Sequence, residues 1–137
     1  MRVKLDRMAF APKREHATDA GIDIRTPIGF YIPAGGTKLI DTGVHMELPH
    51  GTAGFIKSKS GLATKRGIIA DTGVIDEGYT GSIGVMLRNI SRKRQCFKAG
   101  EKIAQLVLVS VRYDKIEIVD ELGKTERGDN GFGSTGR

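Results

Sequence analysis

The C-terminal segment 127–137 gathers several groups that bind anions. Its glycines free backbone N–H groups, Ser134 and Thr135 supply adjacent hydroxyls, and Arg127 supplies a guanidinium. Phe132 adds one aromatic ring to the same segment. A stretch with so little apolar surface does not fold alone. We therefore predict a flexible tail that closes over a phosphorylated ligand with a flat ring.

Three further segments contain residue types suited to phosphate chemistry. Segment 73–81 places Asp76 and Tyr79 around a glycine-containing turn, which predicts a β-hairpin that holds the two side chains close together. Segment 57–63 combines hydroxyl and ammonium groups with a glycine at an expected helix start, where phosphate can bind. Asp23 lies between apolar residues where a strand is expected, the pattern of a surface acid on an edge strand. Each of these segments, taken alone, is equally well read as an ordinary turn, helix cap or surface acid.

Length and composition predict one soluble domain. With 137 residues and one cysteine, the chain is expected to form a single core without disulfides, in a reducing compartment. Residues 1–8 lack the apolar run of a signal peptide, and no stretch approaches the ~18 apolar residues that span a bilayer. We expect a cytoplasmic protein with no membrane partner.

The net charge of +6 favours an anionic partner. The densest basic stretch is 88–98, with Arg92, Lys93 and Arg94 at its centre. Surfaces that bind nucleic acid interleave aromatic residues with such cations, and only Phe97 is close in the sequence. We interpret the stretch as a solvated turn and expect no nucleic-acid partner. The positive charge equally suits attraction of a nucleoside triphosphate.

The apolar pattern predicts strands along most of the chain. Residues 44–48 and 83–87 alternate with period two, whereas residues 103–111 are apolar on both faces. Turns rich in glycine and proline separate these runs, and 60–66 is the single helical candidate. The pattern predicts an all-β sandwich or barrel. A strand like 103–111 needs cover on both sides, from an oligomer interface or from a covering loop.

Five segments, in this order, resemble the motifs of the trimeric deoxyuridine triphosphate nucleotidohydrolases (dUTPases). Any one of them is a weak match, but together they span nearly the whole chain and make the resemblance specific. They are residues 20–24, 60–63, 73–81, 100–105 and 127–136.

The resemblance implies a homotrimer of all-β subunits, each a distorted antiparallel β-barrel of jelly-roll type. Residues 1–126 would form the barrel domain and 127–137 the flexible phosphate-binding tail. Each shared active site would draw the hairpin from one subunit, the phosphate-binding segments from a second and the tail from the third. The implied reaction is Mg²⁺-dependent hydrolysis of dUTP to dUMP and pyrophosphate.

The resemblance also implies a role for each matching residue. Asp76 would be the general base for the water that attacks the α-phosphorus. Asp23 would hold Mg²⁺ through its waters, and Tyr79 would pack under the deoxyribose and exclude a 2′-hydroxyl. The remaining substrate-binding residues would be Lys59, Ser60, Gly61 and Gln105 at the phosphates, Gly73, Val74, Ile75 and Gly84 at the uracil edge, and Arg127, Phe132, Gly133, Ser134 and Thr135 in the tail.

Four positions depart from the usual family pattern. Lys59 stands where arginine is common, so a point charge replaces a bidentate guanidinium. Gly78 and Thr80 stand where an acidic and a basic residue are common, and Asn130 replaces a frequent glycine. None of these departures removes a catalytic group.

Two alternatives to a dUTP diphosphatase are a relative of the dCTP deaminases and a regulatory or nucleotide-binding dUTPase-like protein. Tyr79 and the complete tail favour uracil over cytosine. Asp23 and Asp76 together favour an enzyme, because a pure binding module does not need both carboxylates beside a phosphate site.

Overall fold

The computed structural model describes residues 1–70 and 72–129. Their elements, in chain order, are β1 (Arg2–Leu5), β2 (Gly21–Arg25), β3 (Phe30–Ile32), β4 (Thr37–Glu47), β5 (Thr52–Lys57), α1 (Ser60–Arg66), β6 (Ile68–Ala70), β7 (Val74–Ile75), β8 (Ser82–Asn89), β9 (Gln95–Phe97) and β10 (Lys102–Ser110).

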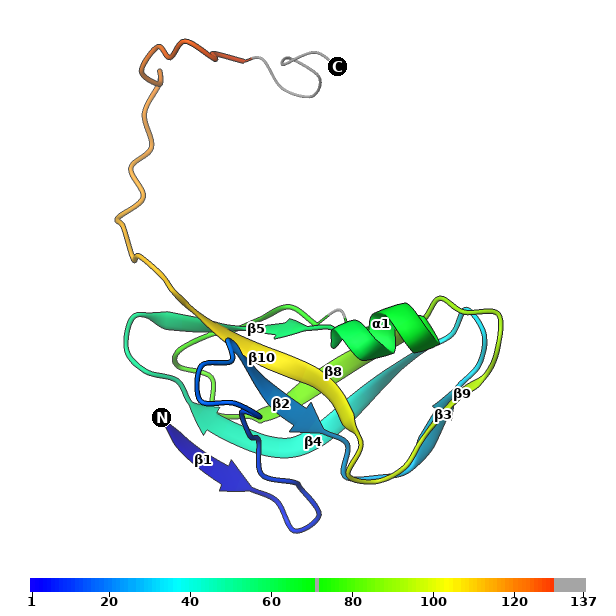
Figure 1. Ribbon diagram of the computed structural model, residues 1–137. Helices are drawn as coiled ribbons and strands as arrows, with labels where there is room; N and C mark the ends of the chain where they lie inside the picture. The colour runs from blue at the N-terminus through cyan, green and yellow to red at the C-terminus, as the bar shows by residue number, and fades with distance from the viewer. Residues whose placement is uncertain (71, 130–137) are drawn as a thin grey trace.

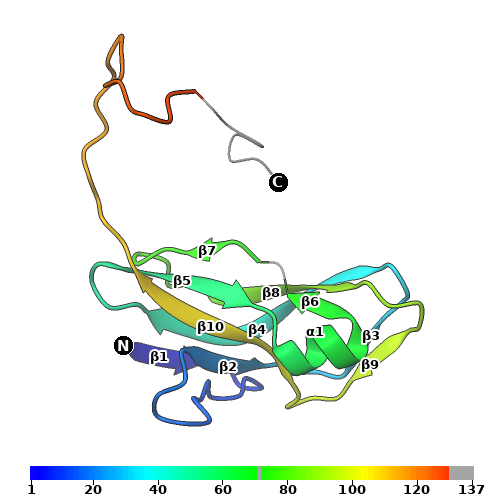
Figure 2. The ribbon, with the colours of Figure 1, turned by 45° about the horizontal axis from the view of Figure 1, so that its top comes forward.

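Two four-stranded sheets and one two-stranded ladder make up the body, and the paired strands are antiparallel. The strand orders are β1-β4-β8-β6, β2-β10-β5-β7 and β3-β9. The β3–β9 ladder projects at one end of the body, and the chain after β10 leaves at the opposite end (Figures 1 and 2). This architecture confirms the predicted all-β, jelly-roll-like fold class.

The period-two pattern explains the core between the sheets. Ile83, Val85 and Leu87 alternate along β8 and are fully buried, while Ile103 and Leu106 of β10 reach the same core from the other sheet. Burial of each such side chain contributes about 1.5–3 kcal/mol. The strands predicted at 44–48 and 83–87 are confirmed.

The predicted helix at 60–66 is also confirmed, with the same bounds. Its last turn carries Lys65 and Arg66, whose charges favour the carbonyl end of a helix. No helix in residues 1–70 and 72–129 is long and apolar enough to cross a membrane.

The two-faced strand β10 is only partly covered within one chain. Ile103, Ala104 and Leu106 are buried, but Val109 is 45% exposed. Residues 111–129 form no strand or helix, and beyond Tyr113, which contacts Glu77, the chain extends away from the body (Figure 1). The domain boundary at residue 126 stays a prediction.

Candidate active site

Gln105 of β10 lies between the strands β2 and β5, near the end of β5. In the strand register it lies opposite Asp23 of β2 and Lys57 of β5. Its amide nitrogen donates a hydrogen bond to the carbonyl oxygen of Ser58 at 3.0 Å. The side chain crosses Gly21 so closely that a Cβ there would meet Oε1 of Gln105 at 2.0 Å. Glycine at position 21 therefore lets Gln105 lie across β2.

Asp23 is buried in an ion network, although β2 is an edge strand. Only 4% of the residue is exposed. One carboxylate oxygen binds Nζ of Lys59, and the other binds Nζ of Lys102 at 2.7 Å. Lys102 also pairs with Glu15 at 2.7 Å. Asp23 is thus not the surface acid that its edge-strand pattern suggested.

The charge state of Asp23 follows from this network. Burial alone would raise the pKa of Asp23, but the hydrogen bonds and charges of Lys102 and Lys59 outweigh burial and lower that pKa. The carboxylate is therefore ionised at neutral pH. It holds Lys59, the predicted phosphate ligand, at the entrance to α1, where Ser60 and Gly61 follow and are exposed. We call Asp23, Lys59, Lys102 and Gln105 the Asp23 cluster.

Asp76 begins a turn that joins the two sheets. The N–H of Tyr79 donates to the carbonyl oxygen of Asp76 at 3.0 Å, so the predicted turn is present. However, β7 pairs with β5, whereas β8 pairs with β4 and β6, and no ladder joins β7 to β8 in the described chain. The prediction of a paired β-hairpin was wrong, because the two strands that flank the turn find their partners in different sheets.

This divergence leaves backbone groups unpaired on both sides of the turn. Within the described residues, Val74 and Ile75 have a strand partner on one edge only, and Gly84 has one only on the β4 side. Farther from the turn, the N–H of Met86 donates a hydrogen bond to Oγ1 of Thr72 at 2.7 Å, and this bond links the chain before β7 to β8. The backbone of Val74, Ile75 and Gly84 therefore presents donors and acceptors that can pair with the edge of a planar base.

Tyr79 folds back across the same turn. Its hydroxyl donates to the carbonyl oxygen of Ser82 at 2.8 Å. The ring lies so close to Gly81 that a Cβ there would meet the tyrosine hydroxyl oxygen at 2.4 Å. Tyr79 remains 44% exposed, which leaves ring surface for a ligand.

Asp76 is among the residues that line a surface hollow of about 500 Å³. Phe55, Val74 and Tyr113 are among the residues that line the same hollow. Within residues 1–70 and 72–129, the side chain of Asp76 makes no hydrogen bond or ion pair. A carboxylate in this setting is available to accept a proton from water.

Glu77 is the residue near the turn that sequence reasoning missed. Its carboxylate accepts hydrogen bonds from the Tyr113 hydroxyl at 2.7 Å and the Gly51 N–H at 2.9 Å, and it contacts Nδ1 of His50 at 2.8 Å. These contacts, with Tyr113 contributing most, lower the pKa of Glu77 to about 2. The same contacts hold the Asp76 turn against the turn between β4 and β5 and against the chain that follows β10. His50 and Tyr113 are 27 and 36 residues from Glu77, so no local pattern could indicate the contact.

The Asp23 cluster and the Asp76 turn lie at different points along β5. Ile75 pairs with Gly54, whereas Lys59 follows the far end of the strand at Lys57. At ~3.3 Å per residue, Gly54 and Lys57 lie roughly 10 Å apart, and Asp76 and Lys59 lie beyond them on opposite sides. One chain alone therefore does not bring this carboxylate and this ammonium group together.

The profile of the dUTPase family matches residues 7–136, which is most of the chain. The chain belongs to the dUTPase family. A deoxyuridine 5′-triphosphate nucleotidohydrolase of Crocosphaera subtropica is 43% identical over 136 residues, which cover 98% of this chain and 96% of the relative.

Solved dUTPase structures share the fold. A dUTPase of Staphylococcus bacteriophage 80alpha, bound to dUpNHpp, has a TM-score of 0.87 and 32% identity, covering 99% of this chain and 98% of the other. A dUTPase of the S. aureus phage phi11, in which the coordination of a structural Mg(II) ion was determined, has a TM-score of 0.81 and 27% identity, covering 88% of this chain and 96% of the other.

The described carboxylates of this dUTPase-family chain form no preformed metal cage. No group of three or more His, Cys, Asp or Glu side chains gathers in residues 1–70 and 72–129. Both oxygens of Asp23 already hold lysines. Mg²⁺ keeps much of its water and binds largely through substrate phosphates. A Mg²⁺ ion at this site would therefore have to be held largely by the phosphates of a nucleotide.

The predicted tail ligands of this dUTPase fall mostly outside the described chain. Phe132, Gly133, Ser134 and Thr135 all lie beyond residue 129. Arg127 is described, next to a turn in which the N–H of Gly128 donates to the carbonyl oxygen of Thr125 at 3.2 Å.

Proposed function

We propose that the chain is a dUTP diphosphatase, which hydrolyses dUTP to dUMP and pyrophosphate. The observation that carries the proposal is the Asp76 carboxylate, which has no partner within the described chain and lies on a turn between two unpaired strand edges. Relatives that match nearly the whole chain are named deoxyuridine 5′-triphosphate nucleotidohydrolases.

Asp76 would act as the general base. Its carboxylate takes a proton from water as the water oxygen attacks the α-phosphorus. The bond from the α-phosphorus to the oxygen that bridges to the β-phosphorus breaks, and pyrophosphate leaves with that electron pair. Lys59 and Gln105, with the exposed Ser60 and Gly61, would bind the phosphates. A Mg²⁺ ion held by the phosphates, and by Asp23 through water, would neutralise charge on the triphosphate.

The base and the sugar would be selected at the turn. The backbone of Gly73, Val74, Ile75 and Gly84 would read the uracil edge, a role supported by the open strand edges at Val74, Ile75 and Gly84. The Tyr79 ring would pack under the deoxyribose and leave no room for a 2′-hydroxyl. Arg127 and the tail residues Phe132, Gly133, Ser134 and Thr135 would close over the base and the γ-phosphate.

We further propose a homotrimer in which subunits share each site. The distance along β5 between the Asp23 cluster and the Asp76 turn supports this arrangement, because a second subunit can bring the two together. Leu39 and Met86 also support it. They are neighbours across β4 and β8 and are 67% and 38% exposed, so the outer face of this sheet has apolar surface to bury.

Mixing two inactive variants tests the shared site. Asp76→Asn and Lys59→Ala subunits should each be nearly inactive, but refolding them together should restore a fraction of dUTP hydrolysis in mixed trimers. Light scattering gives the mass of the assembly. Activity that never recovers in mixed trimers would place both residues in a site built by one chain.

The direct test of the reaction is pyrophosphate release from dUTP, dCTP, dTTP and UTP, with Mg²⁺ and then with EDTA. We expect hydrolysis of dUTP alone, and its loss with EDTA. Ammonia release from dCTP would favour the deaminase alternative. Tight dUTP binding without any turnover would favour a regulatory protein.

Tyr79→Ala should admit UTP. Removing the ring opens the space for a 2′-hydroxyl, and a steric penalty of ~3 kcal/mol corresponds to about a hundredfold selectivity. The measurement is the ratio of kcat/KM for dUTP to that for UTP in the parent and the variant. Tyr79→Phe is the matched control, because it keeps the ring and loses only the hydrogen bond to Ser82. If the ratio is unchanged while both rates fall, Tyr79 only supports the turn.

Tyr113→Phe should lower kcat about three- to tenfold with little change in KM. The variant removes one hydrogen bond that holds Glu77, a contribution of about 0.5–1.5 kcal/mol, and so loosens the neighbouring Asp76. Tyr31→Phe is the control, since the Tyr31 hydroxyl has no hydrogen-bond partner in the described chain. An equal rate in parent and Tyr113→Phe would show that Asp76 does not depend on this contact.

A further inference from the structure

The β3–β9 ladder carries an exposed aromatic residue beside the basic stretch. Tyr31 lies opposite Cys96 in the ladder, and it is 57% exposed. Its neighbours Phe30 and Ile32 point to the other face, where Ile32 is fully buried. Tyr31 therefore faces solvent. The sequence alone did not reveal that an aromatic ring accompanies the cations, because Tyr31 lies more than sixty residues before them.

Arg94 packs on this ring. Its guanidinium carbon lies 5.3 Å from the centre of the Tyr31 ring, a distance at which cation and ring attract. Arg92 and Lys93 precede Arg94, Lys98 follows β9, and all are exposed. None of these four cations pairs with a carboxylate in residues 1–70 and 72–129. We call Tyr31, Arg92, Lys93, Arg94 and Lys98 the basic lobe.

The acid nearest in sequence does not neutralise the basic lobe. Residues 28–38 and 88–100 contain no Asp or Glu. Glu101 follows them, but one of its oxygens accepts a bond from Arg66 at 3.2 Å, and the other accepts from the backbone N–H of Lys98 at 2.9 Å. The lobe therefore concentrates positive charge that attracts an extended anion.

A buried asparagine fixes the loop that presents these cations. Asn89 is fully buried, and its Nδ2 lies 2.8 Å from the carbonyl oxygen of Lys93 and 3.1 Å from that of Ile32. Its Oδ1 accepts bonds from the backbone N–H and the hydroxyl of Ser91 at 2.9 and 2.7 Å. Arg92, Lys93 and Arg94 are thus presented by a loop with fixed backbone contacts, which reduces the entropy lost when they bind a partner.

We propose that the basic lobe binds single-stranded nucleic acid. Arg92, Lys93, Arg94 and Lys98 contact successive phosphates, and an unpaired base extends the stack of Arg94 on Tyr31. Proteins that bind single strands combine a cationic track with aromatic stacking in this way. A duplex already stacks its bases internally and cannot use Tyr31, and an acidic protein offers no flat bases to stack.

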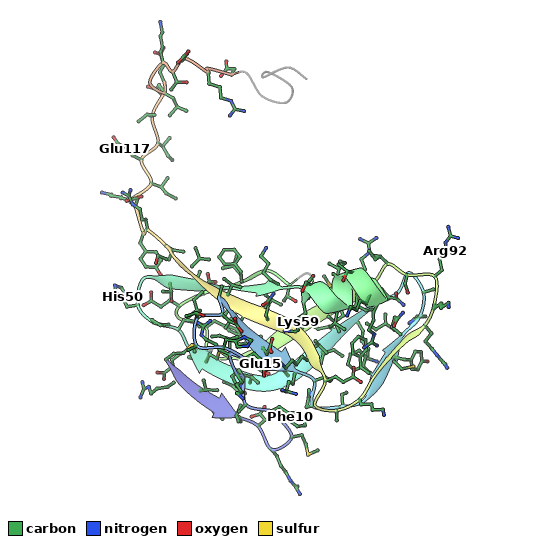
Figure 3. All side chains as sticks on the ribbon, viewed as in Figure 1. Phe10, Glu15, His50, Lys59, Arg92 and Glu117 are labelled. Atoms are coloured by element: carbon green, nitrogen blue, oxygen red, sulfur yellow. The ribbon has the colours of Figure 1, made fainter. Side chains whose placement is uncertain are left out.

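The lobe is separate from the Asp76 turn, where the proposed general base lies. Arg92 lies at the opposite end of the molecule from His50, which contacts the Asp76 turn through Glu77 (Figure 3). The proposal therefore does not rest on dUTP hydrolysis, and either can fail without the other.

Fluorescence anisotropy with a labelled oligo-dT strand, titrated with the full chain, tests the proposal. Binding should weaken with salt, and Arg92→Gln/Lys93→Gln/Arg94→Gln should lower the slope of log K against log salt by about 2, since each phosphate contact on a single strand contributes ~0.7. The charge-matched control is Lys4→Gln/Lys115→Gln/Lys124→Gln, which should leave the slope nearly unchanged.

The stacking part is tested at Tyr31. Tyr31→Ala should weaken oligo-dT binding at least about fivefold, whereas Tyr31→Phe keeps a ring and should bind like the parent. Three results would overturn the proposal: no binding at low salt, an equal loss in the control triple variant, or equal binding of strand, duplex and polyglutamate with no effect of Tyr31→Ala. Circular dichroism confirms that each variant is folded.

Discussion

Replacing Asp76 with asparagine should reduce dUTP hydrolysis by about 10²–10⁴-fold while the protein still binds dUTP. The amide has nearly the shape of the carboxylate but cannot accept the proton of the attacking water. The fold should persist, because the Asp76 side chain is exposed and makes no contact that holds the turn, whose bond from Tyr79 uses the backbone carbonyl. Stopped-flow pyrophosphate release measures turnover, and calorimetry with a non-hydrolysable dUTP analogue measures binding.

Asp120→Asn is the matched control for Asp76→Asn. Asp120 is an exposed aspartate with no partner in the described chain, so the same change of charge there should leave turnover near that of the parent. Parent-like turnover in Asp76→Asn would remove Asp76 from the role of general base. Loss of analogue binding in that variant would assign Asp76 to substrate binding instead.

Deleting residues 127–137 should leave a folded assembly whose kcat/KM for dUTP is lower by at least about a hundredfold. The tail is proposed to supply contacts to the γ-phosphate and a lid, and losing two hydrogen bonds to charged groups costs roughly 3 kcal/mol or more. The core lies within the strands, the last of which ends at Ser110, so the fold does not need these residues.

A chain with residues 127–137 in scrambled order separates the sequence of the tail from its length. It should be as impaired as the deletion, because the contacts depend on the order of Arg127, Phe132 and the hydroxyls. Light scattering and thermal melting report assembly. A truncated chain that no longer assembles would mean that the tail is structural, and a fully active scrambled chain would mean that only its bulk matters.

The local sequence pattern predicted the elements well. The alternation at 83–87 predicted β8, and the single helical candidate at 60–66 matches the observed bounds of α1. These elements depend on residues a few positions apart, so their pattern can be read directly from one sequence. The motif resemblance named Asp23, Lys59 and Gln105 as site residues, and the structure places them side by side, although their roles stay predictions.

The pairing of distant segments was not predictable in the same way. The turn at Asp76 reads as a hairpin, yet its flanking strands join different sheets, because their partners are chosen by burial across the whole core. The contact of Asp23 with Lys102 joins residues far apart in the sequence, and Tyr31 reaches Arg94 only through the β3–β9 register. Such contacts exist only once the fold exists.

The turn that carries Asp76 is also the covalent bridge from β7 in one sheet to β8 in the other. A nucleotide bound there would touch both sheets, so the sheets could not separate without releasing it. Binding of the nucleotide would then raise the free energy of unfolding of the whole body by RT ln(1 + [L]/Kd), where [L] is the free nucleotide concentration. The stabilisation would not be limited to one loop. A partly folded chain in which either sheet is missing would have no site to offer, so capture of the nucleotide would report complete folding.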